Sequence, residues 1–257
     1  MRDCTASMVL YRNPPAVVRD AASSFLNTDG SVMLYVVDNS PEDALRSAFD
    51  GLPVAYHFGG ENAGYGRAHN RAIFEAEPSK YHLVLNPDIL IHAGAIRTLI
   101  RFMDLHPDIG MVCPRVLNED GTDQCLNKRY PSVMDLFVRR FAPHVLDPLL
   151  KTRLDRYEMR DIGYDRMCDV EAMSGAFMLC RTAVLKKVGG FDPRFFLYFE
   201  DFDLSRRIQR EGHRTVYCPE ASVTHYWTRG AHRSMRMAAI FVVSMYRYFG
   251  KWGWTWL

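Results

Sequence analysis

The stretch YHLVLNPD, residues 81–88, is a short apolar run that ends in a turn. A run of this length closed by an Asn-Pro-Asp turn is typical of a buried strand. Similar runs occur at residues 6–11, 33–37, 54–58 and 109–112, and helical spacing of apolar residues lies between them at 16–26, 66–75 and 94–105. This alternation predicts an α/β fold, with a mostly parallel sheet flanked by helices and ligands bound beyond the carboxyl ends of its strands.

The second half of the chain has a different character. Residues 127–160 mix bulky apolar and basic side chains without a clean period, so we expect an insertion of loops and helices there, placed as a lid. Regular patterns return as a strand at 173–180, helices at 182–188 and 200–210, and short strands at 215–217 and 222–224.

The composition is that of an ordinary globular protein. Of 257 residues, 48% are hydrophobic and 24% are charged, and a net charge of +2 gives no support to nucleic-acid binding. The six cysteines form no CxxC pair, which argues against a zinc site and against a disulfide framework. Without a signal peptide or a run of ~20 apolar residues, a cytoplasmic protein is expected.

The end of the chain is basic and rich in tryptophan. No acidic residue follows Glu220. On a helical wheel, one side carries the basic and polar residues Arg233, Arg236, Ser244, Arg247 and Lys251. The opposite side carries the apolar residues Met235, Val242, Tyr246 and Phe249. The same region holds all four tryptophans, Trp227, Trp252, Trp254 and Trp256. This pattern predicts a basic amphipathic helix on an anionic membrane surface, the alternatives being a helix packed on the domain or a dimer contact.

Two carboxylates close predicted strands. Asp38 follows residues 33–37, where it could accept a hydrogen bond from a base or a ribose. Asp88 follows residues 81–85, where it could hold Mg²⁺ or Mn²⁺ together with diphosphate oxygens and water. Each segment taken alone is better explained as a simple turn.

Two glycines, Gly64 and Gly66, precede the helix at 66–75. They would let backbone amides approach a phosphate near the positive end of the helix. The segment is not a dinucleotide fingerprint, because it follows the third strand and holds His69 where a third glycine belongs.

Residues 189–204, GGFDPRFFLYFEDFDL, place aromatic side chains around two adjacent carboxylates, Glu200 and Asp201, at a helix start. The acids alone could merely complement the helix dipole. Aromatic walls would in addition exclude water and raise a carboxylate pKa towards the range useful for a general base.

In this order, the segments resemble the family 2 inverting glycosyltransferases of GT-A type, and among them bacterial rhamnosyltransferases of O-antigen and cell-wall polysaccharide assembly. The resemblance runs over residues 7–234 and finds no motif in 127–160. It implies a glycosyltransferase domain over 1–232, with the nucleotide bound by about 1–120 and the acceptor by about 121–232. Residues 233–257 would then be a membrane-associating tail.

The resemblance also implies roles for individual residues. Asp38 matches an acid that reads the base, and Asp88 matches the metal ligand of an Asp-x-Asp motif whose first acid is here Asn86. Asp201, next to Glu200, matches the catalytic base. His225 matches a histidine that reaches the metal or the diphosphate, although a surface histidine is an equal alternative. The remaining nucleotide-sugar contacts would be Tyr11, Asn62, Gly64, Gly66, Asn70, Ser174 and Gly175.

The implied reaction is an in-line displacement that inverts the anomeric carbon. The donor favoured by the resemblance is dTDP-L-rhamnose, with a UDP- or GDP-sugar as the alternative. The acceptor would be a saccharide on a polyprenyl diphosphate, reached from the inner face of the cell membrane, and a homodimer is left open.

Other classes of protein fit less well. A dehydrogenase would need a glycine fingerprint after the first strand, and a nucleotidyltransferase would need a Gly-rich, Lys-containing loop there. An inactive glycan-binding relative remains an alternative, although Asp88, Asp201 and His225 are all present.

Overall fold

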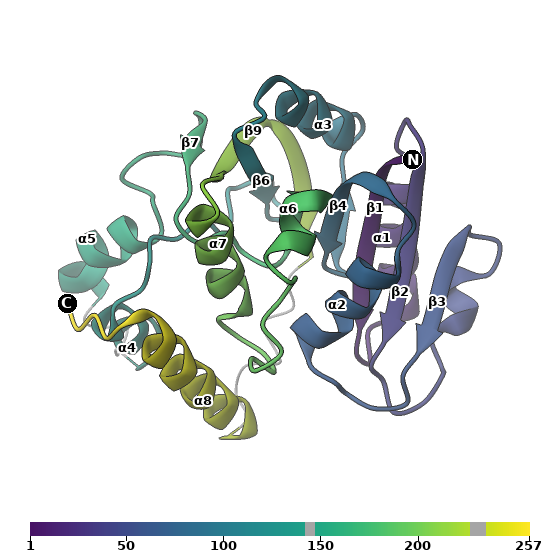
Figure 1. The fold of residues 1–257 in the computed structure, drawn as a ribbon. Helices are drawn as coiled ribbons and strands as arrows, with labels where there is room; N and C mark the ends of the chain where they lie inside the picture. Colours follow the sequence, from purple (N-terminus) through teal and green to yellow (C-terminus); the bar gives the residue numbers. More distant parts are fainter. Residues whose placement is uncertain (142–146, 227–234) are drawn as a thin grey trace.

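A computed structural model describes residues 1–141, 147–226 and 235–257. It contains a nine-stranded sheet with the order β3-β2-β1-β4-β8-β6-β9-β5, and β7 pairs with β9 (Figure 1). Helices cover both faces of the sheet. The predicted α/β fold is confirmed: the sheet is parallel over its N-terminal half and mixed beyond it.

The N-terminal half places the ends of its strands at one edge. Its elements are β1 (Arg2–Leu10), α1 (Pro15–Leu26), β2 (Val32–Asp38), η1 (Arg46–Phe49), β3 (Val54–Phe58), α2 (Tyr65–Glu75) and β4 (Ser79–Leu85). Strand β1 pairs in parallel with β2 and β4, and β2 pairs in parallel with β3. Asp38 and the turn after Leu85 therefore share the carboxyl edge, as the sequence predicts.

The C-terminal half completes the sheet with antiparallel and parallel pairs. Its elements up to the end of the sheet are β5 (Ile89–Ile91), α3 (Ala95–Leu105), β6 (Ile109–Leu117), β7 (Cys168–Asp169), β8 (Phe177–Arg181), α6 (Thr182–Lys187), α7 (Glu200–Arg210) and β9 (Arg214–His225). The strand expected at 173–180 begins only at Phe177, and the residues before it turn towards α7, where the amide of Met173 donates to Ser205 Oγ at 3.1 Å.

The two short strands expected near the end of the sheet are one strand, β9. Its pairing with β6 steps from Pro114↔Cys218 to Arg115↔Ser222, so residues 219–221 bulge out of the register. Pro219 lies in this bulge and has no amide to give to a ladder, which explains why the sequence pattern breaks there.

Side chains alternate between two cores, one on each face of the sheet. On β4, Leu83 and Leu85 belong to the core under α1 and α3, whereas Val84 belongs to the core under α6 and α7. All three are fully buried. This alternation is the period of a strand buried on both faces.

The insertion over 127–160 contains two helices, α4 (Val133–Phe141) and α5 (Asp147–Tyr157), in agreement with the expectation of loops and helices there. Next to them lies the C-terminal helix α8 (Met235–Trp252) (Figure 1). A small apolar cluster joins α4, the residues before α7, and α8, with Leu136, Phe195, Phe199, Tyr248 and Phe249 at its centre.

Helix α8 turns a different side to the protein from the one expected. Ser244 is buried and donates to the carbonyl of Leu197 at 2.8 Å, and Phe249, expected on the opposite side, is buried as well. Val242 and Tyr246 are exposed. The expectation of a basic outer side is thus wrong for Ser244 and for Lys251, whose ammonium lies 2.6 Å from Asp203 Oδ1. Trp227 and Arg233 lie outside the described residues.

Among the residues that the structure describes, no helix is long and apolar enough to cross a bilayer.

Candidate active site

Asp88 and His225 come together at the carboxyl edge of the sheet. Strand β5 pairs antiparallel with β9 so that Ile89 lies opposite His225, and the carbonyl of Asp88 accepts the amide of Tyr226 at 2.9 Å. The side chains meet with Asp88 Oδ1 3.2 Å from His225 Nε2. Both atoms are buried, and neither has a hydrogen-bond partner among the residues that the structure describes.

Gln124 determines the orientation and the tautomer of a neutral His225. Its amide nitrogen donates to the carbonyl of His225 at 2.9 Å, which leaves its oxygen to accept from His225 Nδ1 at 2.8 Å. A neutral His225 then turns the lone pair of Nε2 towards the Asp88 carboxylate. Two electron-rich atoms at this distance repel each other unless a cation binds both, so the pair fits a divalent metal.

Of the described residues, Asp88 and His225 are the two whose side chains would hold this metal. No group of three or more His, Cys, Asp and Glu side chains suited to a metal gathers anywhere in residues 1–141, 147–226 and 235–257. A site with two protein ligands is usual for Mg²⁺, which takes its other oxygens from phosphates and water.

Asp201 and Glu200 begin α7 and differ in their surroundings. Asp201 is partly exposed, and its carboxylate accepts the amide of Gly175 at 3.1 Å and the amide of Phe202 at 2.9 Å. Glu200 is buried, and its Oε2 has no hydrogen-bond partner in the described part of the chain. Burial raises the pKa of both groups, and the backbone amides of Gly175 and Phe202 hold down the pKa of Asp201. The negative charge therefore belongs on Asp201, with Glu200 protonated beside it.

Tyr65, the first residue of α2, links the metal side to the carboxylates of α7. Its hydroxyl donates to the carbonyl of Gly175 at 2.7 Å and lies 3.1 Å from Asn86 Oδ1. Its pKa is raised by burial, then by Glu200, Asp201 and Asp88, so it lies within the field of all three acids. The sequence gives no signal for it: an aromatic residue at a helix start normally reads as core.

Ser174 and Gly175 complete this link. Ser174 Oγ accepts the amide of Ala176 at 3.3 Å, and a side chain on Gly175 would stand 3.4 Å from the Tyr65 hydroxyl. The carbonyl of Ala176 accepts the amide of Asn86 at 2.9 Å. These residues thus tie the strand end before Asp88 to the start of α7.

Asp38 is engaged within the protein. It is fully buried, Oδ2 accepts the Tyr56 hydroxyl at 2.6 Å, and Oδ1 accepts the amide of Ser40 at 2.8 Å. The Ser40 hydroxyl in turn accepts the amide of Arg12 at 2.9 Å and so fixes the loop after β1, which leaves Tyr11 exposed at the same edge. The role of Asp38 towards a base stays a prediction.

The glycines before α2 make room for protein rather than for a ligand. A side chain on Gly64 would lie 2.7 Å from the carbonyl of Phe196, and one on Gly66 would lie 2.8 Å from Phe191 Cβ. The amide of Gly64 already donates to Asn62 Oδ1 at 3.0 Å. In this structure the two glycines let residues 191–196 pack on the helix start, and a contact with phosphate stays a prediction.

Asn70 clamps the same loop. Its side chain both donates to the carbonyl of Phe191 and accepts the amide of Phe191, each at 2.7 Å. This pair of bonds holds the loop before α7 against α2 and so helps to place Asp201.

The aromatic residues before α7 pack mainly towards α8. The ring of Phe199 lies 5.2 Å from that of Phe241 and 5.4 Å from that of Tyr248. Tyr198 and Phe199 have φ angles of 72° and 68°, a left-handed turn that brings the chain abruptly into α7. The aromatic residues expected to enclose the two carboxylates therefore mostly form the surface on which α8 packs.

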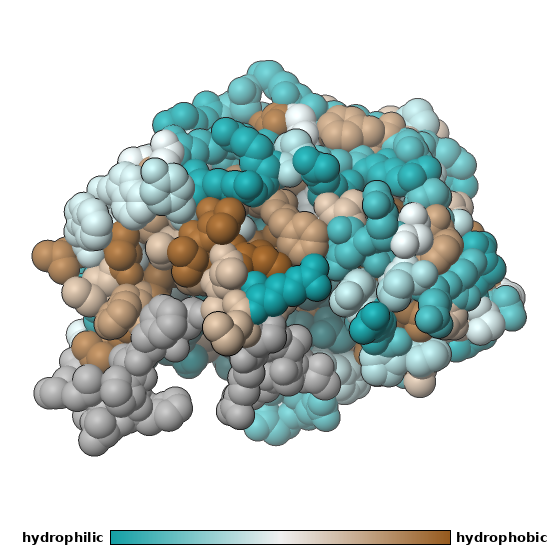
Figure 2. Space-filling model, turned by 90° about the horizontal axis from the view of Figure 1, so that it is seen from below, coloured by the Kyte–Doolittle hydropathy of each residue, from teal (hydrophilic) through white to brown (hydrophobic). Residues whose placement is uncertain are grey.

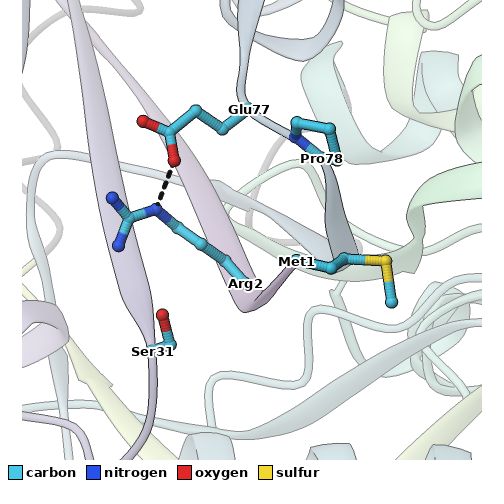
Figure 3. Close-up of a pocket in the computed structure, with 5 residues that line it drawn as sticks. All are labelled: Met1, Arg2, Ser31, Glu77 and Pro78. Carbon is cyan, nitrogen blue, oxygen red and sulfur yellow. Dashed lines mark hydrogen bonds and ion pairs between the residues drawn. The ribbon is translucent and has the colours of Figure 1, made fainter.

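A separate surface pocket lies at the opposite edge of the sheet, where β1 begins. Figure 3 shows Arg2 and Glu77 paired across it, with a distance of 2.8 Å between Nε and Oε2. It holds none of the predicted residues.

The chain is similar to known glycosyltransferases in sequence and in fold. Residues 8–240 match the family described as glycosyltransferase like family 2. An N-acetylglucosaminyl-diphospho-decaprenol L-rhamnosyltransferase of Mycobacterium tuberculosis is 30% identical, over 85% of this chain and 74% of the relative. The rhamnosyltransferase WbbL of Escherichia coli is 26% identical, over 78% of this chain and 75% of the relative.

Solved structures share the fold at low sequence identity. GalNAc-T7 with UDP, GalNAc and Mn²⁺ gives a TM-score of 0.66 at 12% identity, over 90% of this chain and 44% of that one. The mannosyltransferase PcManGT of Pyrobaculum calidifontis with GDP-Man and Mn²⁺ gives 0.62 at 17% identity, over 90% of this chain and 59% of that one.

Proposed function

The chain belongs to the glycosyltransferase family 2, and from that premise we propose that it transfers L-rhamnose from dTDP-L-rhamnose to a lipid-linked saccharide in the synthesis of a bacterial surface polysaccharide. The observation that carries the proposal is the meeting of two sets of groups at one sheet edge. Asp88 with His225 suits a divalent metal that would bind a diphosphate, and Asp201 suits an acceptor hydroxyl.

In the proposed reaction, Asp201 accepts the proton of the acceptor hydroxyl as that oxygen attacks the anomeric carbon. The bond from the anomeric carbon to the diphosphate oxygen breaks on the opposite side, so the configuration inverts. The amides of Gly175 and Phe202 orient the Asp201 carboxylate. Tyr65 and Glu200 present neutral groups beside Asp201. Of these three side chains, only Asp201 is charged and can accept the proton.

Asp88 and His225 would hold Mg²⁺ or Mn²⁺, which would offset the negative charge that grows on the departing nucleoside diphosphate. Asp88 Oδ1 and His225 Nε2 are buried without hydrogen-bond partners among the described residues, which supports this assignment.

We further propose that the protein works as a peripheral protein on the inner face of the cell membrane. Figure 2 shows apolar side chains gathered on the face of the molecule that α8 forms. Exposed apolar residues of α8 and of the chain end after it are Val242, Val243, Tyr246, Trp254, Trp256 and Leu257. Tyrosine and tryptophan seat well at the depth of lipid headgroups. The contact would be chiefly apolar, because Lys251 is engaged with Asp192 and Asp203.

The proposed function is tested with purified protein, Mn²⁺, and a short-chain lipid diphosphate bearing N-acetylglucosamine. We expect a product heavier by one deoxyhexose with dTDP-L-rhamnose and none with UDP- or GDP-sugars. Transfer from another nucleotide sugar alone would replace the donor assignment. No transfer from any donor, with nucleotide still bound, would favour an inactive glycan-binding relative.

A further inference from the structure

Three basic side chains of the insertion converge on one carboxylate, Glu158. Its oxygens lie 3.3 Å from Lys128 Nζ, 3.9 Å from Arg139 Nε and 2.9 Å from Arg160 Nε. Within the described residues, the only other acid that pairs with any of the three is Asp155, 3.8 Å from Arg160. This cationic cluster therefore carries more positive than negative charge.

The cluster borders the proposed catalytic base. Lys128 and Ala172 exchange two backbone hydrogen bonds of 3.0 and 2.9 Å, and Gly175, three residues after Ala172, donates to Asp201. Arg139 lies close enough to Asp201 to lower the pKa of that carboxyl, against the larger effect of burial. The segment that orients Asp201 is thus attached directly to the cluster.

Two groups at the cluster are buried, the Lys128 ammonium and the Tyr157 hydroxyl. The side chain of Lys128 is only 5% exposed, and burial, followed by the nearby charge of Arg139, lowers its pKa to about 7. The Tyr157 hydroxyl is buried beside it, and no hydrogen-bond partner for it exists in the part of the chain that the structure describes. Lys128 Nζ donates to the carbonyl of Cys125 at 2.6 Å and shares Glu158 with two arginines. Such a set of basic groups beside the Tyr157 hydroxyl is suited to an anion.

We propose that Lys128, Arg139 and Arg160 bind the diphosphate of a lipid-linked sugar acceptor, with the Tyr157 hydroxyl as a further donor. Arginine forks suit phosphate oxygens, and both arginines are partly exposed and reachable. The inference rests on the proposed function in one respect only, that the acceptor is a sugar diphosphate.

The course of α4 supports this choice of anion. Phe137 is exposed near the start of the helix, where the amide of Met134 donates to the carbonyl of Trp256 at 3.3 Å in the apolar end of the chain. Arg139 follows two residues later. Helix α4 thus connects the apolar end of the chain with a cation of the cluster, the two kinds of group that a lipid diphosphate would contact.

The test is a binding measurement in excess EDTA, which removes any metal-dependent contribution of Asp88. A short alkyl diphosphate and the matching alkyl alcohol are titrated into the full chain by calorimetry. We expect the diphosphate to bind more tightly than the alcohol. Arg139→Gln and Arg160→Gln should each weaken it by about tenfold or more, as expected for the loss of a charge-assisted hydrogen bond.

Arg166→Gln is the matched control, because Arg166 is exposed and donates to the carbonyl of Ile162 at 3.1 Å. It should leave diphosphate binding unchanged. Equal binding of diphosphate by all variants, or no preference of the wild type for diphosphate over alcohol, would overturn the proposal.

A second titration separates the acceptor diphosphate from that of the donor. Binding of dTDP with Mn²⁺ should be the same in the wild type and in Arg139→Gln, and a parallel loss there would assign the cluster to the donor and refute the inference. Wild-type protein that binds the alkyl diphosphate through these arginines yet transfers no sugar would contradict only the proposed function.

Discussion

His225 Nε2 faces Asp88 Oδ1 at 3.2 Å, although the two residues lie far apart in the chain. The β5–β9 pair brings them together, and Gln124 sets the histidine so that its free lone pair points at the carboxylate. A pair built in this way is incomplete without a cation. In the proposed site, the same geometry would make metal binding depend on Gln124, a residue that would contact neither phosphate nor metal.

Replacing Gln124 should therefore weaken the metal site. Gln124→Ala frees the histidine ring to rotate and to change tautomer, and loss of such an outer partner typically costs ~10–100-fold in metal affinity. We expect the Mn²⁺ concentration for half-maximal transfer to rise by about that factor. His92→Asn is the control, because His92 contacts Ser222 and Thr224 elsewhere on β9. An unchanged Mn²⁺ dependence in Gln124→Ala would contradict the assignment.

The two carboxylates that begin α7 should behave differently. Asp201→Asn keeps the shape but cannot accept a proton, so kcat should fall by ~10²–10⁴-fold. Glu200→Gln replaces a protonated acid by a neutral amide and should cost far less. Nucleotide binding, measured by calorimetry with Mn²⁺, should be unchanged in both. Normal turnover of Asp201→Asn with a severe loss in Glu200→Gln would reverse the two roles.

The pH dependence of transfer should reflect the raised pKa of Asp201. Burial favours its protonated form, so kcat/KM should fall as pH falls through an apparent pKa above the ~3.9 of an ordinary aspartate. Arg139 holds this pKa down, and Arg139→Gln should move the acidic limb to higher pH. The measurement is a pH profile of kcat/KM with a neutral glycoside acceptor. An acidic limb of the kcat/KM profile at the ordinary aspartate pKa would show that burial does not raise the pKa of Asp201 in the working enzyme.

Tyr65 should matter more than its place at a helix start suggests. Tyr65→Phe removes the hydrogen bond to the carbonyl of Gly175, whose amide orients Asp201. We expect kcat to fall by roughly tenfold, about the effect of one lost hydrogen bond at a positioned group. The donor KM should change little. Tyr35→Phe is the control, since the Tyr35 hydroxyl accepts only the amide of Glu77, away from the site. An equal loss in both variants would mean that a general structural effect is responsible.

The sequence predicts the parts of this molecule that depend on local pattern. Strands buried on both faces give apolar runs, and the turns after them place Asp38 and Asp88 at one edge. Strand β5 has only three residues and no detectable period. The pairing of β5 with β9, which brings His225 to Asp88, therefore could not be predicted from the sequence pattern. Gln124 and Tyr65 act through partners distant in sequence, and a residue type alone carries no such information.

The helical wheel of α8 fails for a related reason. A wheel treats the helix as isolated, so it assigns Lys251 to solvent. The half-buried Asp192 and the fully buried Asp203 lie about 50–60 residues earlier in the chain and turn Lys251 inward, while Val242 and Tyr246 remain outside. The membrane-facing side inferred from the structure is consequently the apolar one.

This orientation changes what vesicle binding should show. An apolar contact depends little on salt or on lipid charge, so partition into neutral and anionic vesicles should be similar and should persist as salt rises. Val242→Ser with Tyr246→Ser should release the protein, whereas Arg236→Gln, on an exposed position of the same helix, should not. Binding confined to anionic vesicles and lost in salt would instead show that basic residues make the contact.

The ion pairs under α8 should also make its docking sensitive to acid. Although burial raises the pKa of Asp192, hydrogen bonds from Arg194 and Lys251 bring it below the usual value. A carboxyl whose folded pKa is depressed stabilises the folded state fully above its unfolded pKa, near ~3.9, and the effect is lost as pH falls through the lower folded pKa. Lys251 also meets Asp203, which is fully buried and accepts the indole N–H of Trp252 at 2.9 Å.

Lys251→Met should accordingly loosen α8 by removing the cation shared by the two acids. Arg207 still pairs with Asp203 at 2.7 Å, so we expect a loss of ~1–3 kcal/mol rather than the larger cost of an isolated buried charge. In urea unfolding, followed by tryptophan fluorescence, the midpoint should fall. The acid-induced change should also begin at higher pH, because Asp192 has lost one of its two cations. Arg236→Met, on an exposed position of the same helix, should leave both transitions within ~0.5 kcal/mol of wild type. If Lys251→Met behaved like Arg236→Met, the Lys251 ion pairs would contribute nothing measurable, and the aromatic contacts with Phe199 and the hydrogen bonds of Ser244 and Trp252 would account for the position of α8.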